Sequence, residues 1–462
     1  MPDLQYLLAG ELLSAFRKRE LSPVEVARAS LDRIAEVNLR LNAVCLVDEQ
    51  TTLAAARESE ARWMRAEPVG LLDGVPVTIK DMFPMKGWPT LCGSRTVSRE
   101  GPWLEDAPAV ARLRAHGAVF VGKTTTTEFA HKGVGDSPLT GITRNPWDPS
   151  RTPGGSTAGG GVAAATGVAP LNLGSDGGGS IRIPASFCGV FGLKPGFGRV
   201  PCIPGTGGAL VAEGPLTRSV RDAALMLQVI AEQDDRDPYA YFGGKHDFLS
   251  TLDAGLQGRR IAFARTISAA PVDPDITTAV EAGVRTLADL GATIEEIDLD
   301  FPRADKAYLT INGVAMASFL SWLTDEQKRL MDVGLVSLIS YGERTPAKDY
   351  AHAYHIVRSD FAARMKAIHN RFDLLVLPTM PCVAFAVGLD YPGVQDGSWR
   401  ADWTPFTFPF NLTGQPACSI PCGISSDGLP IGMQIVGPVQ AEQTVLQAAR
   451  AYETVRPIPA LP

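Results

Sequence analysis

The chain has 462 residues, of which 45% are apolar and 20% are charged, and its formal net charge is −7. The length fits two or three domains or one large α/β domain. The net charge is negative and the sequence has no basic run, so nucleic acid and anionic membrane surfaces are not predicted as partners. Seven scattered cysteines, with a step from Cys418 to Cys422 that is not a zinc-site spacing, predict reduced thiols, no bound metal and a cytoplasmic location. The N-terminus shows no signal-peptide pattern, and no apolar stretch is long enough to span a bilayer.

The first predicted elements are two helices within residues 4–40, where leucines recur at helical spacing. The second helix has a clear start signal. Ser22 can cap it, Pro23 suits its first turn, and Glu25 can close a capping box. An N-terminal helical part is therefore expected over residues 1–66.

Strands and helices alternate after residue 70. The residues before Lys80 alternate between apolar and other side chains, which predicts a strand ending at that lysine. The later predicted elements are helices at 107–116 and 275–290, and strands at 118–122, 260–264, 292–299 and 373–378. This order predicts the fold class α/β, a three-layer α/β/α sandwich with a central parallel or mixed β-sheet. A boundary near residue 250 is an alternative, but the strand at 373–378 fits the same sheet and favours a single domain over residues 1–462.

The segment that carries the chemistry is residues 154–180, where ten of 27 positions are glycine. Two glycine clusters contain Ser156 and Ser180, and successive N–H groups in such loops can point at an oxyanion or a phosphate. Neither phosphate-binding motif is present, and the GxSxG turn of many serine hydrolases is absent too. None of the six histidines lies in a catalytic or metal motif, so a Ser–His–Asp hydrolase has little support.

A serine hydrolase without histidine needs another base, and a neutral lysine can serve. Lys80 ends an apolar strand, which is where α/β sheets place their ligands. Burial at that position would lower its pKa and leave it neutral. On position alone, a solvated lysine at a strand end is the alternative.

Three segments resemble the amidase signature family, in order and over nearly the whole chain. They are GVPVTIKD around Lys80, the run from GGSTAGGG at Ser156 through GSDGGGSIRIPAS at Ser180 to GRVP, and NLTGQPACSIPCG with DGLPIGMQIVGP near the end. The resemblance implies the amidase signature fold with a core over about 70–220, and hydrolysis of amide C–N bonds without a metal or cofactor. The chain is similar to stand-alone bacterial amidases and, more distantly, to the glutaminase A subunit of tRNA-dependent amidotransferases.

The resemblance also implies a role for each site residue. Ser180 is the nucleophile that forms the acyl-enzyme, Lys80 is the base, and Ser156, which follows a cis peptide bond from Gly155, relays protons. Backbone N–H groups of three glycines form the oxyanion hole, and a further residue lines the acyl site: Gly177, Gly178, Gly179 and Ala130. The chain departs from the family at Thr157, which is commonly serine, and at Gly177, which is commonly a small residue such as threonine.

Several of these residues have a plainer alternative. Ser180 suits a turn, Ser156 suits a helix N-cap, and Ala130 suits core packing. Arg182 can bind a substrate carboxylate or make structural hydrogen bonds. The aromatic residues of 391–410 can form a mobile wall for an apolar or aryl substrate, or they can pack in the core.

Three functions compete. The first is a free-standing amidase for small-molecule amides that prefers aryl or hydrophobic groups, with carbamates (urethanes) and esters as further substrates. The second is the glutaminase subunit of a tRNA-dependent amidotransferase, but Thr404 stands where such subunits place an aspartate, and their LARYDGVRYG-like stretch is missing. The third is a non-catalytic binding protein, which the intact set of Lys80, Ser156 and Ser180 argues against. We favour the first function and leave a homodimer open.

Overall fold

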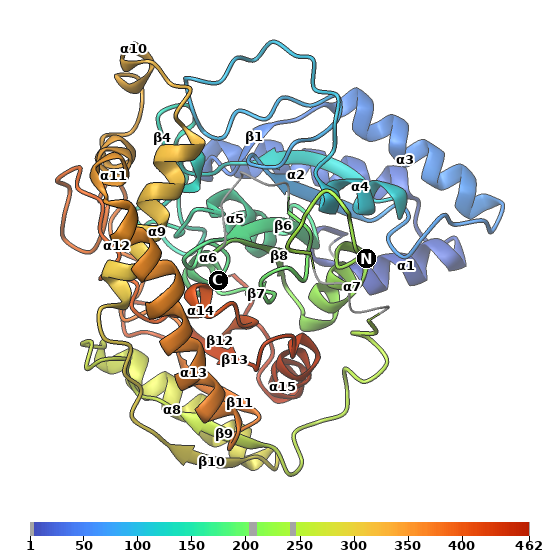
Figure 1. The fold of residues 1–462 in the computed structure, drawn as a ribbon. Helices are drawn as coiled ribbons and strands as arrows, with labels where there is room; N and C mark the ends of the chain where they lie inside the picture. Colours follow the sequence, from blue (N-terminus) through green and yellow to red (C-terminus); the bar gives the residue numbers. More distant parts are fainter. Residues whose placement is uncertain (1–3, 203–209, 241–245, 462) are drawn as a thin grey trace.

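The computed structural model describes residues 4–202, 210–240 and 246–461. Within these ranges, eleven strands form one mixed sheet (Figure 1). In spatial order they are β1 (Val44–Leu46), β3 (Val119–Thr124), β2 (Pro76–Lys80), β6 (Leu171–Asp176), β8 (Ala212–Thr217), β7 (Phe191–Lys194), β12 (Ala417–Ile424), β13 (Pro430–Val436), β11 (Leu374–Pro378), β9 (Arg260–Phe263) and β10 (Thr293–Glu296). A separate short pair consists of β4 (Asp136–Ser137) and β5 (Gly141–Ile142).

The pairing of the strands explains where the site lies. β2 runs parallel to both β3 and β6, so the carboxyl ends of these strands meet at one edge of the sheet. β8 returns antiparallel to β6. β11 runs antiparallel to β13 and parallel to β9, and β12 pairs antiparallel with β7, so residues on both sides of position 250 belong to the same sheet. The predicted α/β class with a mixed central sheet is confirmed.

Helices surround this sheet. In chain order the α-helices are α1 (Ala9–Lys18), α2 (Pro23–Leu41), α3 (Glu49–Met64), α4 (Pro108–Ala115), α5 (Ala158–Ala165), α6 (Arg182–Cys188), α7 (Val220–Ile230), α8 (Pro274–Asp289), α9 (Ala304–Phe319), α10 (Asp325–Lys328), α11 (Val333–Arg344), α12 (Ala347–Ala351), α13 (Arg358–His369), α14 (Pro409–Leu412) and α15 (Glu442–Val455). Short helical turns cover Leu4–Tyr6 and Glu128–Ala130, and a π-helical stretch covers His352–Val357.

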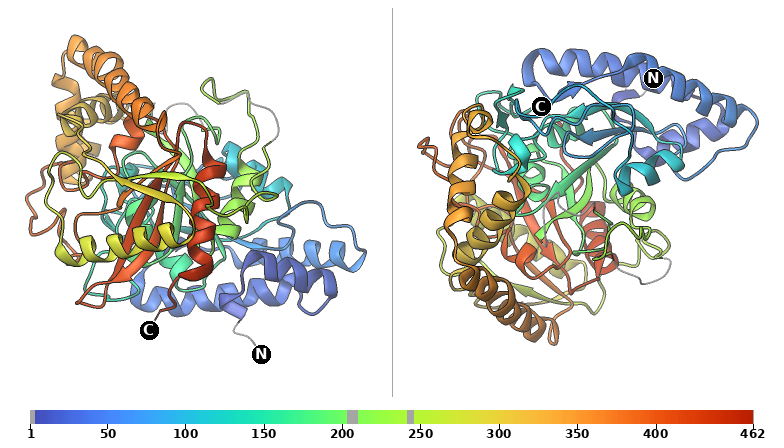
Figure 2. Two further views of the ribbon diagram at one scale, coloured as in Figure 1. Left: turned by 90° about the horizontal axis from the view of Figure 1, so that it is seen from below. Right: turned by 45° about the horizontal axis from the view of Figure 1, so that its top comes forward.

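Apolar residues cover both faces of the sheet. Phe120 of β3 belongs to a core built with α4, α7, α8 and α15, whereas its neighbours Val119 and Val121 pack with α2, α5 and α6. A further core joins α9 and α13 to β9 and β11. Figure 2 shows the blue N-terminal helices and the orange helices α11 to α13 at different sides of the sheet.

Local sequence signals account for the elements nearest the site. Ser22 Oγ accepts a hydrogen bond from Val24 N at 3.0 Å, and Glu25 accepts one from Ser22 N at 2.8 Å, so the predicted capping box starts α2. The predicted strand before Lys80 is β2, which ends at that residue and is buried throughout. Across the described ranges, no helix is both long and apolar enough to cross a lipid bilayer.

Candidate active site

A cavity opens at the carboxyl ends of β2 and β6. Its empty space, including the mouth that is open to solvent, is about 1180 Å³. Two of the predicted catalytic residues, the end of β6 and the loop after it line the cavity: Ser156, Ser175, Gly177, Gly178 and Ser180. Lys80 is the last residue of β2 and lies behind these serines, where it is completely buried.

Lys80 makes two hydrogen bonds into this cluster. Its Nζ lies 2.7 Å from Ser156 Oγ and 2.9 Å from Ser175 Oγ. Burial lowers the pKa of Lys80 to about 7, although the nearby charges of Asp176 and Glu213 act in the opposite direction. A large fraction of Lys80 is therefore neutral near neutral pH, which is the form that can accept a proton. The alternative of a solvated lysine at a strand end is excluded.

Ser156 stands between the lysine and the cavity. The peptide bond from Gly155 to Ser156 is cis. The residue that caps α5 is Thr157, without a side-chain capping bond, so Ser156 does not serve as the N-cap that the plainer alternative assigns to it. Its hydroxyl is turned to Lys80 instead.

Ser180 follows the second glycine cluster. A hydrogen bond of 3.1 Å from Thr157 N to Ser180 O joins the two glycine clusters, so both serines line one cavity. In the described part of the chain, the hydroxyl groups of Ser156 and Ser180 are not hydrogen-bonded to each other. The structure thus brings Lys80 and Ser156 into direct contact and places Ser180 beside them.

The loop between β6 and Ser180 presents backbone N–H groups. Gly179 N donates to Asp176 Oδ1 at 2.7 Å, so this predicted oxyanion donor is already engaged by a carboxylate. The N–H groups of Gly177 and Gly178 have no acceptor among the described residues, and both glycines line the cavity. Gly179 has a φ of +133°, a conformation that side-chain-bearing residues rarely adopt.

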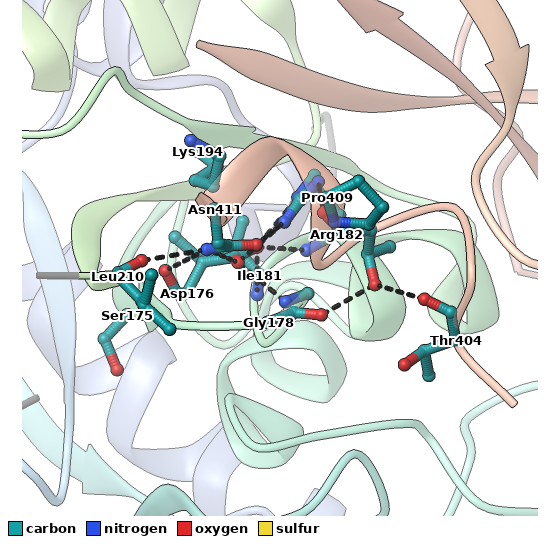
Figure 3. A network of polar contacts seen from close by, with 12 residues as sticks. Ser175, Asp176, Gly178, Ile181, Arg182, Lys194, Leu210, Thr404, Pro409 and Asn411 are labelled. Carbon is teal, nitrogen blue, oxygen red and sulfur yellow. Dashed lines mark hydrogen bonds and ion pairs between the residues drawn. The ribbon is translucent and has the colours of Figure 1, made fainter. Parts of the chain in front are cut away.

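Arg182 and Asp176 form a buried network that holds this loop in place (Figure 3). All five N–H donors of the Arg182 guanidinium are used, because it donates to both carboxylate oxygens of Asp176 and to acceptors on Thr407, Asn411 and Gln434. Burial acts to raise the pKa of Asp176, but the Arg182 guanidinium outweighs it and holds that pKa well below its usual range. Arg182 therefore has a structural role and is not available to a substrate carboxylate.

Tyr308 of α9 is a cavity residue that the sequence does not reveal. Its hydroxyl would lie 2.1 Å from a Cβ atom added at Gly178, so the tyrosine packs directly against the backbone of the loop. Its ring stacks on Trp399 and Phe408, with centroid distances of 5.9 and 5.2 Å. No motif marks Tyr308, whereas Ser175 lies inside the second glycine cluster and its hydroxyl was a usable signal.

Ala130 lies at the wall of the cavity, on a strained segment. Phe129 and Ala130 both have positive φ angles, 46° and 59°. Both residues line the cavity, and Ala130 is only partly buried. This position agrees with a residue that a substrate can reach, which the core-packing alternative does not require.

The aromatic residues of 391–410 divide into two groups. Tyr391, Trp399 and Trp403 line the cavity. Phe406, Phe408 and Phe410 are buried, and they pack in the core formed with α9 and α13. The first group supports the predicted wall and the second supports the packing alternative.

Thr404 also lines the cavity and carries no charge there. Its hydroxyl donates to Ala401 O at 3.1 Å. Of the charged groups in the lining, Lys132 and Asp390 are paired with each other at 3.1 Å, and Lys132 also binds Asp332 at 2.8 Å. Lys132 and Asp390 are thus held by internal ion pairs.

Comparisons with known proteins agree with this geometry. A family model described as amidase matches residues 25–446. The A subunit of the glutamyl-tRNA(Gln) amidotransferase of Gloeobacter violaceus is 36% identical over 96% of this chain and 95% of its own length, and an acylamidase of Rhodococcus erythropolis is 32% identical over 98% and 96%. The crystal structure of a bacterial aryl acylamidase of the amidase signature enzymes superposes with a TM-score of 0.91 at 30% identity, covering 98% of this chain and 96% of that one.

Proposed function

The chain belongs to the amidase signature family and is a hydrolase of C–N bonds, and from this premise we propose that it is a free-standing amidase for aryl and other hydrophobic amides. The observation that carries the proposal is the completely buried Lys80, whose Nζ lies 2.7 Å from Ser156 Oγ beside the cavity that Ser180 lines. In the proposed site Ser180 is the nucleophile, Ser156 the proton relay and Lys80 the base.

The proposed reaction proceeds in two halves. Neutral Lys80 takes the proton of Ser156 while Ser156 takes the proton of Ser180, and Ser180 Oγ attacks the substrate carbonyl. The N–H groups of Gly177 and Gly178 stabilise the oxyanion. The proton then returns through Ser156 to the departing nitrogen, which leaves an acyl group on Ser180. Water, deprotonated by the same relay, hydrolyses this ester and restores the enzyme.

The lining of the cavity supports the substrate preference. Tyr308, Trp399 and Trp403 offer aromatic surface, and Thr404 offers no charge to hold a polar amine. Each buried aromatic contact contributes on the order of 1 kcal/mol to binding. Aryl carbamates and esters present the same carbonyl to the same N–H groups, so we propose them as further substrates.

A second function is favoured by one observation, the 36% identity to the A subunit of an amidotransferase. As the glutaminase component of such an assembly, the protein would need a cavity group for the substrate amine. Thr404 supplies no carboxylate, and Asp390 is already bound to Lys132. The carboxyl group of Glu213 lies in the cavity wall, but burial raises its pKa to about 8, so near neutral pH it is mostly uncharged. The cavity therefore supports the free-standing amidase better.

The two functions are separated by one comparison on a single preparation without partner proteins. We expect kcat/KM to be highest for an acyl anilide, measurable for an aryl carbamate and lowest for glutamine. Glutamine as the best substrate would overturn the proposal and favour the amidotransferase function. A metal chelator should leave the rates unchanged, and full inhibition reversed by zinc would contradict the proposed base.

A further inference from the structure

Glu213 is a buried carboxyl group that lines the catalytic cavity and has no role in the proposed reaction. The residue is 3% exposed, and its Oε2 has no hydrogen-bond partner in the part of the chain that the structure describes. Buried polar oxygens without a partner are rare in folded proteins, so each one calls for an explanation. Glu213 therefore stands out among the cavity residues.

The sheet places Glu213 close to the proposed base. Glu213 of β8 is the direct partner of Ser175 in the antiparallel ladder with β6. Residues paired in this way project from the same face of a sheet. Ser175 Oγ accepts the hydrogen bond of 2.9 Å from Lys80 Nζ. Ser175, the cross-strand partner of Glu213, is thus in direct contact with Lys80.

The charges around Lys80 single out Glu213. The acidic groups whose charges act on the pKa of Lys80 are Asp176, Cys92 and Glu213. Burial raises the pKa of the Cys92 thiol to about 12, so this thiol stays uncharged. Asp176 is neutralised by its bidentate ion pair with Arg182. No ion pair involves Glu213 within the described ranges, so it is the acid beside Lys80 whose charge can change.

The surroundings of Glu213 bring its pKa close to neutral pH, so the carboxyl group can be either protonated or charged there. Burial raises the pKa of Glu213 to about 8; Asp237 acts in the same direction, and the Cys202 thiol and Lys80 act against it. Burial also brings the pKa of Lys80 to about 7. Because Glu213 raises the pKa of Lys80 and Lys80 lowers the pKa of Glu213, the two groups titrate as a coupled pair.

We propose that Glu213 is a positioning residue that sets the charge of Lys80. When Glu213 is neutral, Lys80 has no counter-charge from it, loses its proton at lower pH and can then act as the base. When Glu213 gives up its proton, the Lys80 ammonium gains a counter-charge and holds its own proton to higher pH. The pair can exist as two neutral groups or as an ion pair with the same number of protons, so the exchange needs no other reactant. This inference rests on the proposed function, in which Lys80 is the base.

The test is the pH dependence of kcat/KM for an acyl anilide, compared between the natural enzyme and Glu213→Gln. Glutamine keeps the shape of the side chain and cannot ionise. Because an ionised Glu213 can only raise the pKa of Lys80, we expect the acid limb of Glu213→Gln to move to lower pH, by roughly half a unit or more, and to follow a single ionisation. Glu213→Asp should retain two ionisations, since it keeps a titratable group.

The matched control is Asp222→Asn on α7. Asp222 is another buried acid with a raised pKa, of about 6, but it accepts a hydrogen bond from Ala9 N away from the cavity. Its replacement should leave the pH profile unchanged. If Glu213→Gln does not fold, as judged by circular dichroism, Glu213→Met provides the same comparison, because methionine fills irregular buried space.

Different results would contradict the role of Glu213 and the proposed amidase function. Suppose that the pH profile of kcat/KM for Glu213→Gln or Glu213→Met superimposes on that of the natural enzyme, while Lys80→Ala is inactive. This result overturns the role of Glu213 and leaves the proposed function unchanged. If Lys80→Ala retains the activity, the proposed function itself is wrong.

Discussion

The environment of Lys80 determines whether this residue can act as the base of the proposed reaction. Its Nζ is completely buried between two serine hydroxyls, and burial brings its pKa to about 7. Because the protonated lysine cannot accept a proton, we expect kcat/KM to fall as the pH decreases through about 7 and to reach a plateau above it. Lys80→Met should lose at least about a thousandfold in kcat, as removal of a catalytic base does. Unchanged activity at pH 5, measured with a neutral anilide, would contradict a lysine base.

Gly178 is the position at which the loop and Tyr308 meet. An added Cβ would lie 2.1 Å from the Tyr308 hydroxyl, so Gly178→Ala must push the loop or the tyrosine away. We expect a loss of roughly tenfold or more in kcat/KM, since small displacements of oxyanion donors are costly. Gly10→Ala is the control, because an added Cβ there meets nothing within 4 Å.

The coupling of these two residues can be measured directly. In the double variant Gly178→Ala with Tyr308→Ala, the steric conflict is absent, so the combined loss should be smaller than the sum of the two single losses in free energy. Strictly additive losses would show that the contact does not limit activity.

The turn from β6 into α6 is the structural element on which the site depends. Arg182 joins it to segments more than 200 residues away, through Thr407, Asn411 and Gln434. Arg182→Met leaves Asp176 buried without its partner, so we expect the free energy of unfolding to fall by about 3–5 kcal/mol. Urea denaturation checks this. Arg364→Met, which removes an exposed ion pair with Asp360, should cost less than about 1 kcal/mol, and equal costs would contradict the account.

The elements near the site show what the sequence can and cannot predict. The start of α2 and the strand before Lys80 follow from local patterns, a capping box and an apolar alternation, and both are confirmed. The partners of Arg182 are not predictable in this way, because its hydrogen bonds depend on tertiary packing of distant segments. The same holds for Tyr308, which reaches the loop from a helix without any motif of its own.

The aromatic segment illustrates a further limit. A cluster of aromatic residues in a Gly- and Pro-rich stretch predicts buried surface, but periodicity does not say whether a substrate or the core covers each ring. In the structure, Trp399 faces the cavity while Phe406 is part of the core.

At the scale of the whole molecule, distant segments together form one wall of the cavity. Trp399 donates from Nε1 to His131 O at 2.7 Å and stacks on Tyr308, so three parts of the chain meet at this ring. We expect Trp399→Ala to raise KM for an acyl anilide by roughly tenfold, and to change KM for a small aliphatic amide much less. Trp322→Ala removes an exposed ring and serves as the control. Equal effects on both substrates would argue against an aryl-binding wall.

The central claim, an acyl-enzyme at Ser180 formed by the free-standing chain, has a direct test. The purified protein is mixed with an activated aryl ester near pH 8, where Lys80 is neutral and can act as the base, and the reaction is quenched with acid within milliseconds so that the acyl-enzyme is trapped before it hydrolyses. The intact mass is then measured together with the mass of the proteolytic peptides. We expect one added acyl group on the peptide that contains Ser180, and no adduct in Ser180→Ala. An adduct on any other residue, or an unchanged adduct in Ser180→Ala, would contradict the account.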